Sequence, residues 1–198
     1  MKICTIGVGY VGLVTGTCFA ELGNDVIGVD VDLKKIDNLK QGIIPIYEPG
    51  LTEMVKRNIK EGRLCFQTDL IEAVEVSDII YIAVGTPSSE DGDADLTYLK
   101  NAALEIAKGM GSTYKIIVNK STVPVGTGDI VAKILIDQGI PNDRFSVVSN
   151  PEFLREGNAV YDFLHPDRII IGSNQRKAAE EISELYKILN CPVLITDL

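Results

Sequence analysis

Three glycines lie at close spacing near the start of the chain, in the segment 7–12 (Gly-Val-Gly-Tyr-Val-Gly). The segment follows a short apolar run at 2–6 and precedes an amphipathic stretch that ends at Gly23. In a strand–turn–helix unit, Gly7 permits the sharp turn, Gly9 lets the backbone approach a pyrophosphate, and Gly12 lets the helix lie close to the sheet. The helix N-terminus then offers free N–H groups to the anion. The spacing predicts a dinucleotide-binding turn, and the alternative is a tight turn without a ligand.

An acid closes the second apolar run, which covers 25–30 and ends at Asp30. A carboxylate at this place accepts hydrogen bonds from a ribose diol and repels a 2′-phosphate, so it favours NAD over NADP. Lys35 follows five residues later. Its spacing fits two readings equally: a lysine that helps to hold the adenosine side, or a solvated lysine in the first turn of a helix.

Hydroxyl groups follow two later apolar runs. Thr86 lies in the segment 85–88 (Gly-Thr-Pro-Ser) and offers its hydroxyl to a phosphate or a ribose. Ser121 and Thr122 follow the run 115–118, and each fits either the cap of the next helix or a contact to a cofactor ribose or a water near the nicotinamide. The acidic stretch 90–93 between these regions is expected to be an exposed turn, because its spacing lacks the full calcium-loop pattern.

A loop with two acids and an arginine follows the run 145–148, in the segment 149–157 (Ser-Asn-Pro-Glu-Phe-Leu-Arg-Glu-Gly). Glu152 is a candidate general base if its surroundings are partly desolvated. The alternative is a salt bridge within the loop. Since ligands bind beyond the carboxyl ends of the strands in open parallel sheets, this loop is expected to face the cofactor.

Strand-length apolar runs alternate with helical patterns along the chain. This alternation predicts a doubly wound, mostly parallel sheet covered by helices on both faces, a Rossmann-like three-layer α/β/α fold. No Pro- or Gly-rich linker divides the chain, so residues 1–198 are expected to form one domain. The predicted strands are 2–6, 26–29, 64–67, 78–84, 115–118, 145–148, 168–171 and 193–195, and the predicted helices are 10–22, 32–40, 50–60, 95–109, 126–138 and 174–189.

The composition excludes several classes of protein. The net charge of −9 without a basic cluster argues against nucleic acid or an anionic membrane surface as a partner. The uncharged stretch 3–20 resembles a signal peptide or a membrane span, but glycines and threonines interrupt it, which favours a soluble protein. The four cysteines form no C-x-x-C pair and are expected to be small core residues in a reducing cytoplasm. His165 is the sole histidine, so a His-rich metal site is excluded and no metal is expected.

Taken together, these segments resemble the UDP-glucose/GDP-mannose dehydrogenase family. The resemblance covers nearly the whole chain, in the family's order. It is carried by 7–13 (Gly-Val-Gly-Tyr-Val-Gly-Leu), 45–51 (Pro-Ile-Tyr-Glu-Pro-Gly-Leu), 84–87 (Val-Gly-Thr-Pro), 120–126 (Lys-Ser-Thr-Val-Pro-Val-Gly), 150–157 (Asn-Pro-Glu-Phe-Leu-Arg-Glu-Gly) and 165–172 (His-Pro-Asp-Arg-Ile-Ile-Ile-Gly).

The resemblance implies oxidation of the C6 alcohol of UDP-glucose to the acid with two NAD, through a cysteine thiohemiacetal and then a thioester. In the family's pattern the nucleophilic cysteine, a substrate-binding lysine, the dimer-forming helix and the UDP-binding domain lie beyond residue 198. The chain alone is therefore expected to bind NAD without turnover, and the full-length enzyme to be a homodimer or larger. GDP-mannose oxidation and a stand-alone NAD-binding regulatory module are the alternatives.

The resemblance also implies roles for individual residues. Glu152 matches a general base and Thr122 a residue that helps to place the attacking water. The substrate loop it implies is Glu152, Phe153, Leu154, Arg155 and Glu156. The cofactor contacts, to which the hydroxyl of Ser121 is added from its position alone, are Gly7, Val8, Gly9, Tyr10, Val11, Gly12, Asp30, Lys35, Thr86, Ser121, Thr122 and Glu156.

Overall fold

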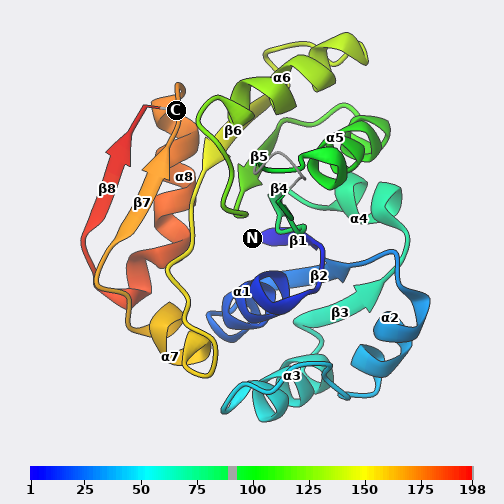
Figure 1. The fold of residues 1–198 in the computed structure, drawn as a ribbon, viewed down its shortest axis with the longest axis vertical. Coiled ribbons are helices and arrows are strands. Elements are labelled where there is room, and N and C mark those ends of the chain that lie inside the picture. Colours follow the sequence, from blue (N-terminus) through cyan, green and yellow to red (C-terminus); the bar gives the residue numbers. More distant parts are fainter. Residues whose placement is uncertain (89–92, 198) are drawn as a thin grey trace.

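The computed structural model describes residues 1–88 and 93–197. Its strands are β1 (Lys2–Ile6), β2 (Asp25–Val29), β3 (Leu64–Gln67), β4 (Ile79–Ile82), β5 (Lys115–Asn119), β6 (Phe145–Ser149), β7 (Ile169–Gly172) and β8 (Val193–Thr196). They form one sheet in the order β3-β2-β1-β4-β5-β6-β7-β8 (Figure 1). The strands from β3 to β6 in this order run parallel to one another. Their carboxyl ends therefore share one edge, as the sequence predicts.

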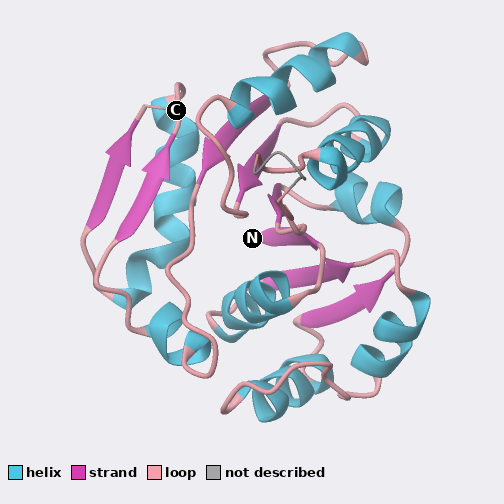
Figure 2. Cartoon of the chain, viewed as in Figure 1, coloured by secondary structure: helices cyan, strands magenta, loops and turns pink. Residues whose placement is uncertain are grey.

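Helices cover both faces of the sheet (Figure 2). They are α1 (Tyr10–Glu21), α2 (Leu33–Lys40), α3 (Leu51–Lys60), α4 (Leu70–Val76), α5 (Thr97–Gly109), α6 (Thr127–Asp137), α7 (Ala159–Leu164) and α8 (Arg176–Tyr186), and a short 3-10 turn, Lys187–Leu189, follows α8. Apolar residues of α1, α2, α3, α7 and α8 share one core cluster, and those of α4, α5 and α6 share a second one. The predicted doubly wound, three-layer fold is confirmed.

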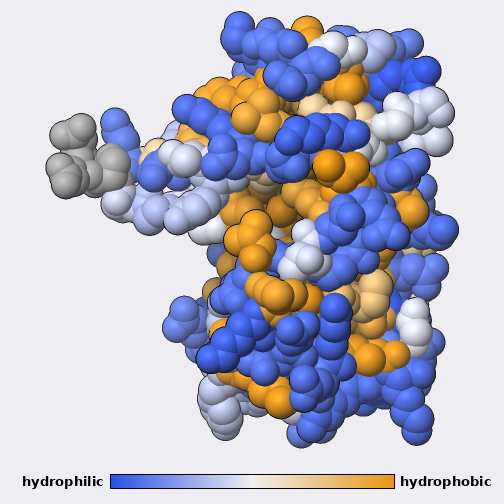
Figure 3. Space-filling view, turned by 90° about the vertical axis from the view of Figure 1, so that its right-hand side faces the viewer, coloured by the Kyte–Doolittle hydropathy of each residue, from blue (hydrophilic) through white to orange (hydrophobic). Residues whose placement is uncertain are grey.

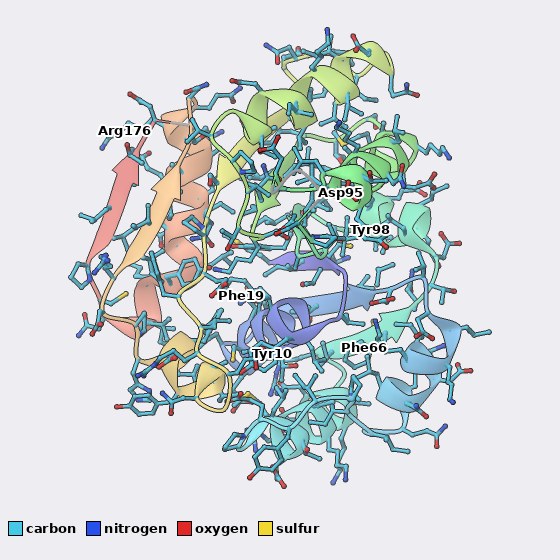
Figure 4. All side chains as sticks on the ribbon, in the orientation of Figure 1. Tyr10, Phe19, Phe66, Asp95, Tyr98 and Arg176 are labelled. Atoms are coloured by element: carbon cyan, nitrogen blue, oxygen red, sulfur yellow. The ribbon has the colours of Figure 1, made fainter. Side chains whose placement is uncertain are left out.

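The central strands are buried on both sides, which explains their continuous runs of isoleucine and valine. Every residue of β4 and β5 is buried. Phe19 lies on α1 (Figure 4). The centre of its ring lies 5.1 Å from that of Tyr81, 5.2 Å from that of Phe163 and 5.4 Å from that of Tyr186. This aromatic group joins α1 to β4, α7 and α8, and so connects the glycine turn with the later part of the chain.

Two short helices, α4 and α7, are absent from the sequence prediction. A capping signal marks the first of them, because the Asp69 carboxylate accepts a hydrogen bond from the Glu72 N–H at 3.0 Å. Helix α6 begins one residue later than the predicted start at 126. Its cap is Gly126, whose φ is +85°, and its first residue is Thr127.

Strand β7 runs antiparallel to β6, and one pair of residues, Ser149 and Gly172, joins them. Because Gly172 is the last residue of β7, the rest of β7 reaches past the carboxyl end of β6. Strand β8 pairs with β7 in parallel. This reversal places the segment before β7 above the carboxyl edge of the sheet, where it forms one wall of a pocket.

The surface over α2, α4 and α5 is mostly hydrophilic, with apolar residues in patches between the polar ones (Figure 3). Among residues 1–88 and 93–197, no helix is both long enough and apolar enough to cross a membrane. The uncharged stretch 3–20 forms β1 and most of α1 instead.

Candidate functional site

The glycine turn between β1 and α1 depends on backbone space that a side chain would fill. Gly7 has φ of +86°, and a Cβ there would lie 2.9 Å from the Ala83 carbonyl oxygen. A Cβ at Gly12 would lie 1.8 Å from the Gly7 carbonyl oxygen. A Cβ at Gly9 would meet no atom within 4 Å. The turn thus closes tightly on itself at Gly7 and Gly12 and leaves open space at Gly9.

The first turn of α1 faces that open space with unsatisfied donors. The N–H groups of Tyr10, Val11 and Gly12 have no acceptor among the described residues. Such a helix end carries a partial positive charge and binds anions. The Val8 N–H is different, because it donates to the Asp30 carboxylate at 3.1 Å. The open turn and the free N–H groups fit the pyrophosphate of a dinucleotide.

Asp30 is held firmly at the end of β2. Its carboxylate accepts hydrogen bonds from the Val8 N–H, from the Asp32 N–H at 3.0 Å and from the Lys35 ammonium at 2.8 Å. Partial burial raises the pKa of Asp30, but the hydrogen bonds and the positive charge of Lys35 outweigh it and lower the pKa. The alternative of a purely solvated Lys35 is wrong. A carboxylate accepts about four hydrogen bonds, so one position is left for a ribose hydroxyl.

Replacing Asp30 by alanine is expected to weaken NAD binding about tenfold or more, since a hydrogen bond to a charged group contributes about 1.5–3 kcal/mol. Discrimination against NADP should fall with it, because the charge that repels a 2′-phosphate is gone. Isothermal titration of the chain with NAD and with NADP measures both effects. Asp25→Ala is the matched control, because it removes an exposed acid from the other end of β2. Unchanged NAD affinity in Asp30→Ala would show that the ribose is held elsewhere.

The loops after β4 and β5 are joined by hydroxyl groups. The Thr86 hydroxyl donates to the Thr122 carbonyl at 3.0 Å, and the Ser121 hydroxyl donates to the Val84 carbonyl at 2.6 Å. Neither Ser121 nor Thr122 caps α6, which begins at Thr127. The helix-cap alternative is therefore wrong. The Thr122 side chain is exposed, and its hydroxyl has no partner among the described residues, so it is available to a ligand.

Glu48 connects the glycine helix with the loop after β6, although sequence alone does not mark it as a site residue. Its side chain is 4% exposed. It accepts hydrogen bonds from the Tyr10 hydroxyl, from the Gly157 N–H at 2.9 Å and from the Val160 N–H at 3.4 Å. Tyr10 projects from the start of α1 (Figure 4), and burial and the bond to Glu48 raise its pKa to about 12. In the sequence, Glu48 is only an acid within the segment 45–51. Its hydrogen-bond partners Gly157 and Val160 lie far along the chain, so the sequence alone does not indicate their contact.

A pocket of about 490 Å³ opens beside the loop after β6. Within it, one oxygen of Glu152 accepts a hydrogen bond from the Leu154 N–H at 2.6 Å. The other oxygen of Glu152 has no partner in the described chain, so it is free to take a proton. The pocket is lined by Lys120, Pro151, Glu152, Phe153, Leu154, Arg155, Tyr161, Asp162, Phe163, His165, Pro166, Asp167, Arg168, Ile169 and Tyr186.

Arg155 pairs with Asp162 and not with Glu152. Its guanidinium donates two hydrogen bonds to that carboxylate, at 2.7 and 3.0 Å, and they lower the pKa of Asp162 to about 2. The alternative of a salt bridge within the loop 149–157 is therefore wrong, because the partner of Arg155 lies on α7 and Glu152 stays unpaired. Phe153 is 53% exposed and lies under the Arg168 guanidinium at 5.3 Å. Glu156 is exposed.

The pocket lacks a cysteine. Cys4 and Cys18 are fully buried, as expected of core residues, and burial raises the pKa of both thiols. Cys65 is exposed and Cys191 is half-buried, so the expectation of core positions is wrong for these two, and both lie outside the pocket lining. Across the described ranges, no three His, Cys, Asp or Glu side chains form a group that could hold a metal ion. Residues 90–92 of the expected acidic turn lie outside the described residues.

Comparison with known proteins identifies the family. Residues 1–190 match the model of the UDP-glucose/GDP-mannose dehydrogenase family, NAD binding domain. The chain belongs to this family. NAD is accordingly its cofactor.

Individual relatives in the family agree. UDP-glucose 6-dehydrogenase TuaD of Bacillus subtilis is 54% identical over 100% of this chain and 42% of its own length. The UDP-glucose dehydrogenase structure from Pyrobaculum islandicum matches 98% of this chain and 46% of its own, with 42% identity and a TM-score of 0.95. The structure of GDP-mannose dehydrogenase from Pseudomonas aeruginosa, in a ternary complex, matches 100% of this chain and 46% of its own, with 38% identity and a TM-score of 0.97. The chain spans less than half the length of these dehydrogenases.

Proposed function

We propose that residues 1–198 are the NAD-binding domain of a UDP-glucose 6-dehydrogenase, which oxidises UDP-glucose to UDP-glucuronate with two NAD. The carrying observation is that one edge of the sheet gathers the open glycine turn, Asp30 and the pocket of Glu152. The 54% identity to the Bacillus relative favours UDP-glucose as the substrate. The nucleophilic cysteine and the UDP-binding part are assigned to residues outside this chain.

In this reaction NAD, when bound, accepts the hydride from C6. At this edge of the sheet, residues of the chain hold the cofactor and transfer the proton. The α1 N-terminus and Asp30 hold the pyrophosphate and the ribose, while Lys35 fixes the Asp30 carboxylate. The free oxygen of Glu152 takes the proton from the C6 hydroxyl as the hydride leaves, and later from the water that cleaves the thioester. The exposed hydroxyl of Thr122 places that water.

The remaining assignments follow from the family and the charge. We place the enzyme in the cytoplasm, as a homodimer or larger homo-oligomer in its complete form. The net charge of −9 argues against nucleic acid and anionic membranes as partners. GDP-mannose 6-dehydrogenase is the second candidate, favoured by the TM-score of 0.97 to the Pseudomonas structure.

The purified chain is expected to bind NAD and to form no NADH from either nucleotide sugar, because its pocket has no nucleophilic cysteine. The complete protein should form two NADH per UDP-glucose. Titration calorimetry and NADH absorbance measure the two properties separately. Turnover of UDP-glucose by the chain alone would overturn the assignment of the nucleophilic cysteine to residues outside this chain. Turnover of GDP-mannose but not UDP-glucose by the complete protein would support the second candidate, and failure to bind NAD would contradict both.

A further inference from the structure

Lys120 is a buried lysine at the carboxyl end of β5 and lines the same pocket as Glu152. It is 3% exposed, and it lies between the start of the loop after β6 and the end of α8. Taking an ammonium group out of water is costly unless a carboxylate or several acceptors compensate it. A buried lysine in a substrate pocket therefore needs a reason.

The local contacts of Lys120 compensate its charge poorly. Its ammonium donates to the Asn150 side-chain oxygen at 3.4 Å, a long bond. That oxygen also accepts from the Tyr186 hydroxyl at 2.6 Å, and the Asn150 amide donates to the Ile170 carbonyl at 2.9 Å. The ammonium also lies 5.9 Å from the centre of the Tyr186 ring. Asn150 is thus fixed from two sides, and it satisfies one of the three lysine donors.

Lys120 forms no ion pair with any carboxylate of residues 1–88 or 93–197. The other pocket cations are engaged differently: Arg155 binds Asp162, and Arg168 lies over Phe153. The remaining titratable groups of the lining are Glu152, Tyr161, His165, Asp167 and Tyr186. His165 stacks on Tyr161 at 4.3 Å. Glu152 is the carboxylate whose charge acts on Lys120.

Lys120 and Glu152 therefore line the same pocket as a cation and an anion that do not touch. One oxygen of Glu152 is tied to the Leu154 N–H, and the other is free. Because both groups line this pocket, a hydroxyl or a water bound there lies near both charges. The negative charge of Glu152 favours the charged form of Lys120.

We propose that Lys120 is a positioning residue for Glu152: its buried ammonium holds the Glu152 carboxylate in the orientation that faces the oxygen of the substrate. The proposal rests on the proposed dehydrogenase function, in which Glu152 takes the proton. It adds a residue that acts through the base and not on the cofactor.

The titration of Lys120 supports this role. Burial lowers the pKa of Lys120 to about 8, and the negative charge of Glu152 keeps it from falling further. The ammonium is therefore charged near neutral pH and loses its proton in mildly alkaline solution. Above that pH the carboxylate no longer has a cation beside it.

Lys120→Met in the complete enzyme is expected to lower kcat about 10- to 100-fold, as the loss of a supporting group does, with KM for NAD unchanged. It should also remove the inflection near pH 8 from the profile of kcat. Added ethylammonium should restore part of the activity of Lys120→Ala. A variant that keeps its kcat and the inflection would overturn the proposal.

Lys115→Met is the matched control, because Lys115 lies at the other end of the same strand. It is 2% exposed, and its ammonium donates to the carbonyl groups of Ser77 at 2.6 Å and Glu75 at 3.0 Å. Its loss should lower thermal stability and leave the pH profile of kcat intact. Equal changes in both profiles would reduce Lys120 to a structural role.

A second measurement needs neither substrate nor turnover. The side-chain nitrogen of Lys120, followed by NMR in the chain itself, should titrate near pH 8 in the wild type and at lower pH in Glu152→Gln. An unchanged titration in Glu152→Gln would overturn the coupling even if Lys120→Met fails to fold. If the titration of Lys120 depends on Glu152 but the complete protein does not oxidise UDP-glucose, the proposed function is wrong. The electrostatic coupling of Lys120 and Glu152 would still be established.

Discussion

Glu152→Gln is expected to lower turnover of the complete dehydrogenase about 10²- to 10⁴-fold, the range for loss of a general base, while NAD binding by the chain stays the same. Glutamine keeps the shape of the side chain and an oxygen that accepts the Leu154 N–H, so the loop should keep its conformation. What is lost is the oxygen that has no partner and can take a proton. Steady-state formation of NADH from UDP-glucose measures the effect.

Glu53→Gln is the control for this variant. Glu53 is an exposed acid on α3, outside the lining of the pocket. Its replacement by glutamine therefore removes one negative charge without changing the site. Its turnover should equal that of the wild type. If Glu152→Gln also turns over normally, the proton goes to another group and Glu152 is only a binding residue.

The cofactor side of the site is largely predictable from sequence because it is local. The glycine turn, the helix that follows it and Asp30 lie within the first thirty residues, and their spacing is fixed by one strand–turn–helix–strand unit. The shared edge of the later loops also follows from sequence, because parallel strands place their carboxyl ends together. The hydrogen bond from the Val8 N–H to the Asp30 carboxylate connects the glycine turn with the end of β2.

The pocket beside the loop after β6 depends on contacts between distant parts of the chain, and these leave no periodic signal in the sequence. Glu48 accepts a hydrogen bond from the Gly157 N–H across 109 positions of the chain, a contact that forms only in the folded protein. The direction of β7 is equally hidden, because an apolar run reads the same in either direction. Its reversal brings the segment 165–168 to the pocket and closes the wall above Lys120.

Gly9→Ala and Gly12→Ala are expected to separate two functions of the same turn. Gly9 has φ of −74° and ψ of −160°, which alanine adopts freely, and its Cβ would meet no protein atom within 4 Å. The free energy of unfolding of the Gly9→Ala variant should therefore differ from that of the wild type by no more than about 1 kcal/mol. The new methyl group occupies the space that the pyrophosphate needs, so NAD affinity should fall about tenfold or more.

Gly12→Ala should act on the fold itself. Its Cβ would lie 1.8 Å from the Gly7 carbonyl oxygen, a backbone atom that can yield only if α1 moves away from the sheet. Such overpacking costs about 3 kcal/mol or more, and the shifted helix end no longer aims its N–H groups at the anion. Thermal unfolding and NAD titration of both variants give four numbers that test the turn. If Gly9→Ala binds NAD as the wild type does, the pyrophosphate does not lie over Gly9. If Gly9→Ala is destabilised as strongly as Gly12→Ala, the open space beside the first helical turn belongs to the fold and not to the ligand.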